Sequence, residues 1–375
     1  MIAYKYKLYS NARNGHLDSQ IDQFGRLYNH CIALHRRYYR IFKQSVNVYA
    51  LTNHIAKLKK IERFHWIAEL PSQAVQDVAR RIDKAYLLFF RSLKHSVKAA
   101  PPSFKPRRKY KSFTLTQAGY AFNGNQIRIG KKRYGFHKSR EMQGRIKTVT
   151  IKRDECGDFW IIAVTDWEKP GRGFTTGKSA GFDFGMKVFL TSSDGDDVEA
   201  PLFLKRDHNK RKALCRSLSS KQRGSNSRRK AKLALARFYR TIESRRNDFQ
   251  WKIADRLVNK YDVLCFEDLN LKGISHLFGK KCGEYGFAEF LHKVESKCSE
   301  YGKGFVKIGR FYPSSKTCHK CGWIKSDLKL SERTWQCNGC GEIHDRDRNA
   351  AMNILRVGAS TRGGEDVRLA SASGL

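Results

Sequence analysis

Four cysteines in the last sixty residues of the chain form two closely spaced pairs. Cys318 and Cys321 make the first Cys-x-x-Cys pair, and Cys337 and Cys340 make the second after fifteen intervening residues. This spacing is typical of a tetrahedral Zn²⁺ site with four thiolate ligands. A redox-active Cys-x-x-Cys pair is the other interpretation, but it would need no second copy. Because four protein ligands leave no position for a substrate water, we expect one structural zinc ion.

Three acidic residues, far apart in the sequence, could do chemistry together. Asp183 lies within Gly-Phe-Asp-Phe-Gly, Glu267 ends Val-Leu-Cys-Phe-Glu, and Asp347 follows the second cysteine pair. A lone carboxylate in an apolar strand is costly to bury, whereas Mg²⁺ favours carboxylates and leaves positions for water and phosphate. Two such ions about 3.5–4 Å apart suit phosphodiester hydrolysis. Each acid alone is more simply a surface carboxylate or a helix cap, but the ordered set favours a catalytic site.

The hydrophobic pattern predicts the elements that position these residues. Apolar residues recur every three to four positions from about Leu17 to Lys98, which indicates helices, one of them beginning at Ser72. Short runs rich in Tyr, Phe, Thr, Ile and Val over residues 113–166 indicate a small β-barrel or sheet. The alternation from Tyr4 to Tyr9 would supply one more strand. The helical region would then be an insertion.

The second half of the chain alternates strands with helices. Residues 179–191 and 261–269 indicate strands, and residues 205–259 and 287–301 indicate helices. This alternation predicts an α/β domain. The tail after Val357 is rich in Gly, Ser and Ala, and we expect it to be disordered.

The charge of the chain points to a polyanionic partner. Its 74 Lys and Arg residues outnumber 35 Asp and Glu residues, which gives a net charge of +39. Residues 205–250 alone contain 16 basic and 3 acidic residues. A solvated basic surface or an anionic membrane is an alternative, but a phosphate backbone is the leading partner.

The sequence also indicates where the protein works. It has no basic leader followed by an apolar stretch, and no window approaches about 18 uninterrupted apolar residues. The cysteines outside the two pairs are scattered singly, as in a reducing compartment. We therefore expect a soluble, cytoplasmic protein without a membrane partner.

Taken together, the motifs resemble the TnpB family, transposon-encoded RNA-guided DNA endonucleases related to the type V CRISPR effectors. The resemblance spans nearly the whole chain. Its C-terminal motifs are the most specific, and the segments that carry it are Phe182–Gly185, Glu267–Asn270, the two cysteine pairs, residues 345–355, Leu70–Gln73, Ala85–Tyr86, Phe89–Phe90 and Pro102–Lys105.

The resemblance implies a RuvC-like α/β nuclease domain of RNase H type with an inserted zinc ribbon. A wedge β-barrel that carries a helical recognition insert would precede it. The implied boundaries are residues 1–12 for the first wedge strand, 13–100 for the recognition helices, 101–175 for the wedge barrel, 176–312 for the nuclease domain with its basic helical segment 205–260, 313–343 for the ribbon, 344–357 for the C-terminal nuclease helix and 358–375 for a disordered tail.

The resemblance also implies the roles of the acids. The catalytic carboxylates fall on Asp183, Glu267 and Asp347, which would hold two Mg²⁺ or Mn²⁺ ions. Asp345 competes for the third place. We favour Asp347 because it immediately precedes the Asn-Ala-Ala-Met-Asn-Ile helix, and we expect Asp345 to cap or turn the chain.

The implied partners are a guide RNA from the transposon end and double-stranded target DNA beside a short motif. The basic segment, with Arg228 and Arg229, is a candidate contact for the guide or the heteroduplex, although a solvated helical hairpin is nearly as good an explanation. Gln73, Gln76 and Phe113 are candidates for reading the target-adjacent motif. No protein partner is indicated, and the source would be a bacterium or archaeon, with the protein on the nucleoid when bound to DNA.

Two other functions stay open at this point. The first is an RNA-guided repressor that binds DNA without cutting it, although all three acidic positions are intact. The second is a transposase or resolvase that uses the same carboxylate chemistry without RNA.

Overall fold

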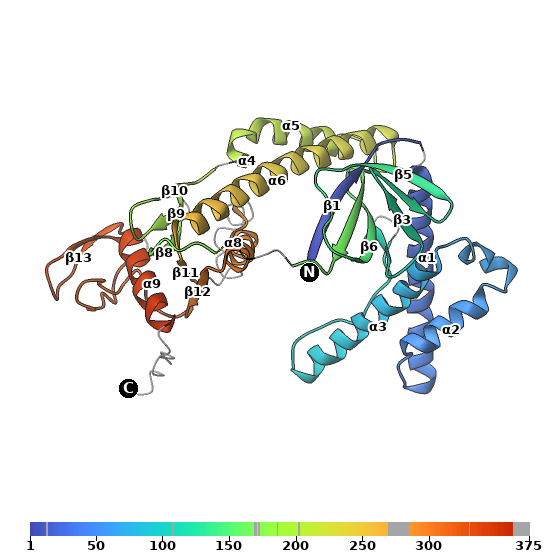
Figure 1. Ribbon diagram of the computed structural model, residues 1–375, viewed down its shortest axis with the longest axis horizontal. Helices are drawn as coiled ribbons and strands as arrows, with labels where there is room; N and C mark the ends of the chain where they lie inside the picture. Colours follow the sequence, from blue (N-terminus) through green and yellow to red (C-terminus); the bar gives the residue numbers. More distant parts are fainter. Residues whose placement is uncertain are drawn as a thin grey trace. The chain divides into compact units, whose positions relative to one another are not determined.

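The chain folds into two compact units, Met1–Glu168 and Lys169–Leu375 (Figure 1). This computed structural model describes residues 1–12, 14–106, 109–168, 171, 173–185, 187–201, 203–268, 285–329 and 331–362. The division comes seven residues before the boundary expected at 175–176. No helix among the described residues is both long and apolar enough to cross a membrane.

An antiparallel sheet in the first unit curves into a nearly closed barrel (Figure 1). Its strand order is β2-β6-β7-β1-β5-β4-β3. The strands are β1 Ile2–Leu8, β2 Ser112–Leu115, β3 Tyr120–Asn123, β4 Gln126–Ile129, β5 Lys132–His137, β6 Ile146–Arg153 and β7 Phe159–Thr165. Strand β1 pairs with β7 from Ile2 opposite Thr165 to Lys7 opposite Trp160, and its end pairs with β5. The first strand of the chain therefore lies in the middle of the sheet.

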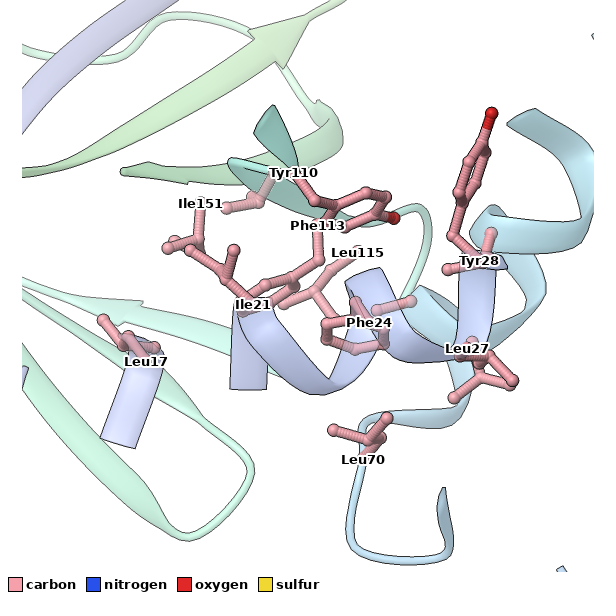
Figure 2. Close-up of a cluster of buried hydrophobic side chains, with 14 of the residues drawn as sticks. Leu17, Ile21, Phe24, Leu27, Tyr28, Leu70, Tyr110, Phe113, Leu115 and Ile151 are labelled. Atoms are coloured by element: carbon pink, nitrogen blue, oxygen red, sulfur yellow. The ribbon is translucent and has the colours of Figure 1, made fainter. Parts of the chain in front are cut away.

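Helices fill the segment between β1 and β2, as the sequence pattern predicts. They are α1 Asn14–Phe42, α2 Val48–Leu58, the 3-10 helix η1 Glu62–Ile67 and α3 Ser72–Lys94. Helix α1 buries a stripe with helical spacing that includes Leu17, Ile21 and Phe24. Figure 2 shows this stripe facing the strand residues, and the ring centroids of Phe24 and Phe113 are 5.0 Å apart. The insert and the barrel share one hydrophobic core.

The position of Phe113 argues against the role expected for it. Its side chain is only 1% exposed and packs inside this core. A ring in this position offers no surface to a nucleic acid. The strand pattern around Phe113 is therefore a core pattern, and the interpretation as a reader of the target-adjacent motif was wrong for this side chain.

The second unit contains a mixed five-stranded sheet with the order β10-β9-β8-β11-β12. Strands β8, β9 and β10 form an antiparallel meander, and β11 pairs parallel with both β8 and β12. The strands are β8 Ser179–Phe184, β9 Val188–Ser192, β10 Val198–Glu199, β11 Val263–Glu267 and β12 Gly304–Ile308. The intervening helices are α4 Phe203–Arg206, α5 His208–Ser219 and α6 Asn226–Lys260 before β11, and α8 Phe287–Tyr301 before β12. This is the α/β arrangement that the sequence predicts.

Successive residues of β8 and β11 point to opposite faces of this sheet. Phe182 and Phe266 pack on one face, in the hydrophobic core that includes residues of α6 and α8. Gly181 and Cys265 lie on the other face, which is covered by α9, Arg346–Arg362. Helix α9 continues past residue 357, where the sequence placed its end; residues 363–375, the rest of the predicted tail, lie outside the described residues.

Helix α9 approaches the sheet so closely that glycine is required at two points. A Cβ on Gly181 would lie 2.2 Å from the carbonyl oxygen of Ala351 and 2.4 Å from the backbone nitrogen of Leu355. A Cβ on Gly358 would lie 2.4 Å from the Cys265 sulfur. The Gly181 contact joins backbone to backbone, so no side-chain movement can relieve an added methyl group.

We predict that Gly181→Ala destabilises the second unit by about 2 kcal/mol or more, because the backbone of α9 must move away from β8. Thermal or urea denaturation measures the loss. The matched control is Gly15→Ala in α1, where an added Cβ meets nothing within 4 Å. We expect this control to be neutral or slightly stabilising. An unchanged melting temperature for Gly181→Ala would contradict the direct packing.

Candidate active site and metal centre

The strand register brings two of the three predicted acids side by side. Cys265 pairs with Gly181 and Phe266 with Phe182, so the next residues, Glu267 and Asp183, continue the same parallel register. By the alternation of the strands, both acids point to the face of the sheet that α9 covers. Both side chains are half-buried at the ends of their strands.

The third acid comes to the same place from α9. Asp347 is the second residue of this helix, and the helix packs on β8 and β11. The charges of Glu267 and Asp347 both act on Asp183. Burial, reinforced by these two carboxylates, raises the pKa of Asp183 to about 8. Burial and the neighbouring Asp268 also raise the pKa of Glu267. Within the described residues, the fold thus gathers negative charge that the backbone N–H of Phe184 and the charge of Arg346 offset only in part.

An arginine from the segment between the cysteine pairs contacts this site. The Nη1 atom of Arg333 lies 3.1 and 3.2 Å from the two carboxylate oxygens of Asp347. No sequence pattern marks this residue, because a single arginine in a basic chain does not stand out. Among the described residues, the three acids do not have the spacing of a ready metal site.

Asp345 has the capping role that we expected for it. It ends strand β14, Ile343–Asp345, and α9 begins at the next residue. Its Oδ1 atom accepts a hydrogen bond of 2.9 Å from the backbone N–H of Arg348. This contact satisfies a donor in the first turn of the helix. The carboxylate of Asp345 is therefore used at the helix end.

The four cysteines come together as their spacing predicts. Their ligand atoms all lie within 4.8 Å of one another. The sulfur atoms of Cys318 and Cys340 are 3.7 Å apart, and those of Cys321 and Cys337 are 3.5 Å apart. Tetrahedral zinc with Zn–S bonds of about 2.3 Å requires sulfur atoms about 3.8 Å apart. The donor set and its spacing therefore fit one Zn²⁺ ion.

The backbone around the thiols has matching turns in both pairs. Each pair is followed by a glycine with positive φ, 81° at Gly322 and 73° at Gly341. The N–H of Gly322 donates to the carbonyl of Cys318, and that of Gly341 to the carbonyl of Cys337. The repeated Cys-x-x-Cys-Gly pattern was a signal in the sequence that we did not use. A left-handed residue favours glycine, so both positions require it.

The environment of Cys337 favours its metal-binding form. Burial raises the pKa of this thiol, but hydrogen bonds from the backbone N–H groups of Cys340 and Gly339, together with those to the Cys321 and Cys318 thiols, lower it to about 7. His344 lies beside the cluster, with its Nε2 atom 3.0 Å from the sulfur of Cys318. The hairpin β13, Thr334–Gln336, with β14 frames this small unit, and Trp335 is buried in it.

Two buried asparagines join the cysteine unit to α9. The Nδ2 atom of Asn349 donates to the carbonyl of Thr317, and that of Asn353 to the carbonyls of Ser314 and Thr317. The Oδ1 atom of Asn349 accepts from the backbone N–H of His319. One helix turn separates the two asparagines, so both lie on one face of α9. The first cysteine pair is thus fixed to the helix that carries Asp347.

The candidate nucleic-acid contacts differ in their surroundings. Arg228 donates to the carbonyls of Leu218 and Lys221 and so closes the turn between α5 and α6. Arg229 is exposed on the same hairpin. Gln73 and Gln76 are half-buried in the first turns of α3, and Gln73 accepts a hydrogen bond from Thr116. Arg228 therefore has a structural partner, whereas Arg229 faces solvent.

The basic hairpin presents charge rather than apolar surface. Helix α5 has no buried residue, and the first half of α6 buries little. Many of its basic side chains are exposed, namely Lys210, Lys212, Arg216, Lys221, Arg223, Arg229, Lys230, Lys232 and Arg237. Such a surface suits contacts with phosphates, which need charge and no sequence reading.

We predict that Asp183→Asn stabilises the protein at high pH when divalent cations are absent. Between the ordinary carboxyl pKa of 3.8 and the raised value of about 8, the folded state keeps a proton that the unfolded chain releases. Stability therefore falls as pH rises through this window, and an amide removes the loss. The melting temperature of Asp183→Asn should exceed that of the parent protein at pH 8–9, and this difference should shrink toward pH 5. The exposed Asp248→Asn is the control, and a gain independent of pH would contradict the interpretation.

We also predict that Cys337→Ser loses the zinc that the parent protein binds in about equimolar amount, because three thiolates hold the ion far less tightly. Elemental analysis of the purified proteins measures the content. Cys215→Ser, which changes a cysteine outside the cluster, should keep it. Full zinc content in Cys337→Ser would refute the four-thiolate site.

Two known families match separate parts of the chain. Residues 163–277 match the family described as "Probable transposase" (OrfB_IS605), and residues 287–354 match the "Cas12f1-like, TNB domain". The first range contains Asp183 and Glu267, and the second contains the four cysteines and Asp347. The matches therefore cover each residue of the candidate site.

Relatives match over longer stretches. A "Putative RNA-guided DNA endonuclease" of Streptomyces pristinaespiralis is 28% identical over 98% of this chain and 92% of its own length. The protein InsQ of Escherichia coli K12, described in the same words, is 25% identical over 81% of this chain and 79% of its own length. The TnpB-like protein L79 of Acanthamoeba polyphaga mimivirus is 30% identical over 56% of this chain and 43% of its own length.

Solved structures share the fold. A Cas12f1 structure, determined in a complex with sgRNA and target DNA, superposes with a TM-score of 0.60 at 16% identity, over 93% of this chain and 83% of its own. The mini-RNA-guided endonuclease Cas_phi3 gives 0.51 at 10% identity, over 95% and 92% of the two chains. These two likenesses show the fold alone. The sequence matches confirm the resemblance that the motifs indicated: the chain is similar to TnpB-like proteins, which include relatives described as RNA-guided DNA endonucleases.

Proposed function

We propose that the chain is an RNA-guided DNA endonuclease of a transposable element. The observation that carries the proposal is the gathering of Asp183, Glu267 and Asp347, which come from two parallel strands and one helix, on a single face of a mixed sheet. The names of its relatives support the guided activity. In this proposal the second unit is a RuvC-like nuclease with an inserted zinc ribbon, and the first unit is a wedge barrel with recognition helices.

The three carboxylates would hold two Mg²⁺ ions. The raised pKa of Asp183 fits this role, because the site has an excess of negative charge that cations would offset. When bound, such ions supply Lewis acidity for attack of water on a phosphodiester and for departure of the leaving oxygen. The charges of Glu267 and Asp347 both act on Asp183, so this carboxylate would be the central one of the three residues that hold the ions.

Arg333 adds a positive charge at the edge of the same site. It pairs with Asp347 in the protein described here, and both side chains are partly exposed. A phosphate at the carboxylates would compete for this guanidinium, which can form paired hydrogen bonds to phosphate oxygens. In this proposal Arg333 moves from Asp347 to the DNA as the site loads.

The guide RNA and the DNA account for the charge of the chain. A net charge of +39 favours polyanionic partners, and base pairing can read sequence while the protein holds the backbones. The exposed basic residues of the α5–α6 hairpin offer such contacts. We propose that the guide derives from the transposon end. The motif beside the target would then be read near Gln73 and Gln76.

The test uses the protein purified with the RNA that is transcribed from its own flanking DNA. We expect the complex to cut matching double-stranded DNA in Mg²⁺ and to stop in EDTA. Asp183→Ala, Glu267→Ala and Asp347→Ala should each lower the single-turnover rate at least about a hundredfold, because each removes a ligand of the ions. Asp248→Ala, an exposed acid on α6, should cut like the parent.

The outcomes separate the alternatives. Guided binding without cutting by the parent would instead support an RNA-guided repressor. Cutting that needs no RNA would support a transposase or resolvase. Parental cutting by Asp183→Ala would refute the proposed carboxylate site.

A further inference from the structure

A tight turn follows the strand next to Glu267. Ile308, the last residue of β12, pairs with Glu267 in the parallel register. The next four residues, Gly309 to Tyr312, form a turn in which the N–H of Tyr312 donates to the carbonyl of Gly309 over 3.1 Å. Phe311 lies at most about 11 Å along the chain from Ile308. The turn therefore lies at the same end of the sheet as the carboxylates.

Contacts on both sides of Phe311 hold this turn in place. The Nη2 atom of Arg310 donates to the carboxylate of Asp268 over 2.7 Å, and its Nε atom donates to the Asp268 carbonyl over 3.2 Å. Tyr312 packs against the cluster of Ile308 and Ile354, and its hydroxyl accepts a hydrogen bond from Arg356. The neighbours of Phe311 are thus anchored, one to the residue after Glu267 and the other to α9.

The ring of Phe311 itself is left in solvent. It is 88% exposed, the largest fraction among the large hydrophobic side chains in the described part of the chain. Within that part, no aromatic ring or cation packs on it. A scattered surface hydrophobe needs no explanation. Phe311 differs from a scattered hydrophobe because its turn is anchored on both sides, at the end of the sheet where the three acids lie. The contacts of its neighbours therefore set the position of the turn before any ligand binds.

We propose that Phe311 stacks on a nucleobase of the DNA strand that the three carboxylates hold. This inference rests on the proposed function and names a residue that positions its substrate. Stacking on an aromatic side chain accepts every base, since each base has a π-face. A nuclease that leaves sequence reading to its guide needs such tolerance beside the cut. Because Arg310 is already paired with Asp268, the turn offers a ring rather than a free charge.

The first test detects stacking without cleavage. Single-stranded target DNA that carries 5-iodouracil is bound to the protein–RNA complex in Ca²⁺ and irradiated. We expect a crosslink to Phe311, located by mass spectrometry. Phe311→Ala and Phe311→Leu should lose it, whereas Tyr49→Ala, which alters a ring 77% exposed in the other unit, should keep it. Crosslinks that stay unchanged in Phe311→Ala would overturn the proposal.

The second test measures the consequence for cutting in Mg²⁺. We expect Phe311→Ala to lower the single-turnover rate about tenfold or more, with zinc content and melting temperature unchanged. Phe311→Trp should keep the rate and Phe311→Leu should not, because stacking needs a flat ring. Equal rates for Phe311→Leu and the parent would overturn the proposal. A parent that crosslinks at Phe311 but never cuts would refute the nuclease and leave the stacking intact.

Discussion

At Gly181 the backbone of β8 lies against the backbone of α9, with no side chain between them. This contact sets the position of the helix, and through it the position of Asp347 relative to Asp183 two residues along the strand. A second close contact, of Gly358 with Cys265, fixes the far end of the same helix on β11. The acids can therefore repel one another without moving apart, because packing along the whole helix holds them in place. The pKa of Asp183 is raised because its side chain is buried and because the carboxylates of Glu267 and Asp347 are held near it.

The cysteine unit also helps to hold α9 in position. Asn349 and Asn353 bind the carbonyls that precede the first cysteine pair, and Arg333 reaches back to Asp347. Any ion that orders the thiolates also orders these carbonyls, and with them the first turns of α9. A structural metal and a catalytic one would thus share a single helix, although their ligands are chemically different. This arrangement gives a physical reason for placing the cysteine unit immediately before the last acid.

Spacing and strand patterns were enough to predict the thiolate cluster and the insertion of helices after the first strand, whereas the capping role of Asp345 was expected from the family resemblance. These features depend on local chemistry, which the order of residues determines. The roles of Phe113 and Arg333 depend on what lies across the fold. Phe113 has a strand pattern that suits either a surface or a core, and only α1 decides between them. The acceptors of Arg228 lie near it in the sequence, at the end of α5 and in the following turn, but only the folded hairpin brings their carbonyls to the guanidinium.

The place of β1 in its sheet has a consequence for how the chain folds as it is made. Its main partner is β7, which ends at Thr165, so the two strands meet only after about 160 further residues have been synthesised. Until then the edge of β1 that faces β7 has unpaired backbone donors and acceptors, which invites pairing with other chains. Helices α1 to α3 form from local contacts in the meantime. The helical insert thus delays the pairing of β1 with the later strands during synthesis. Completing the barrel is therefore a late step of folding that joins residues far apart in the sequence.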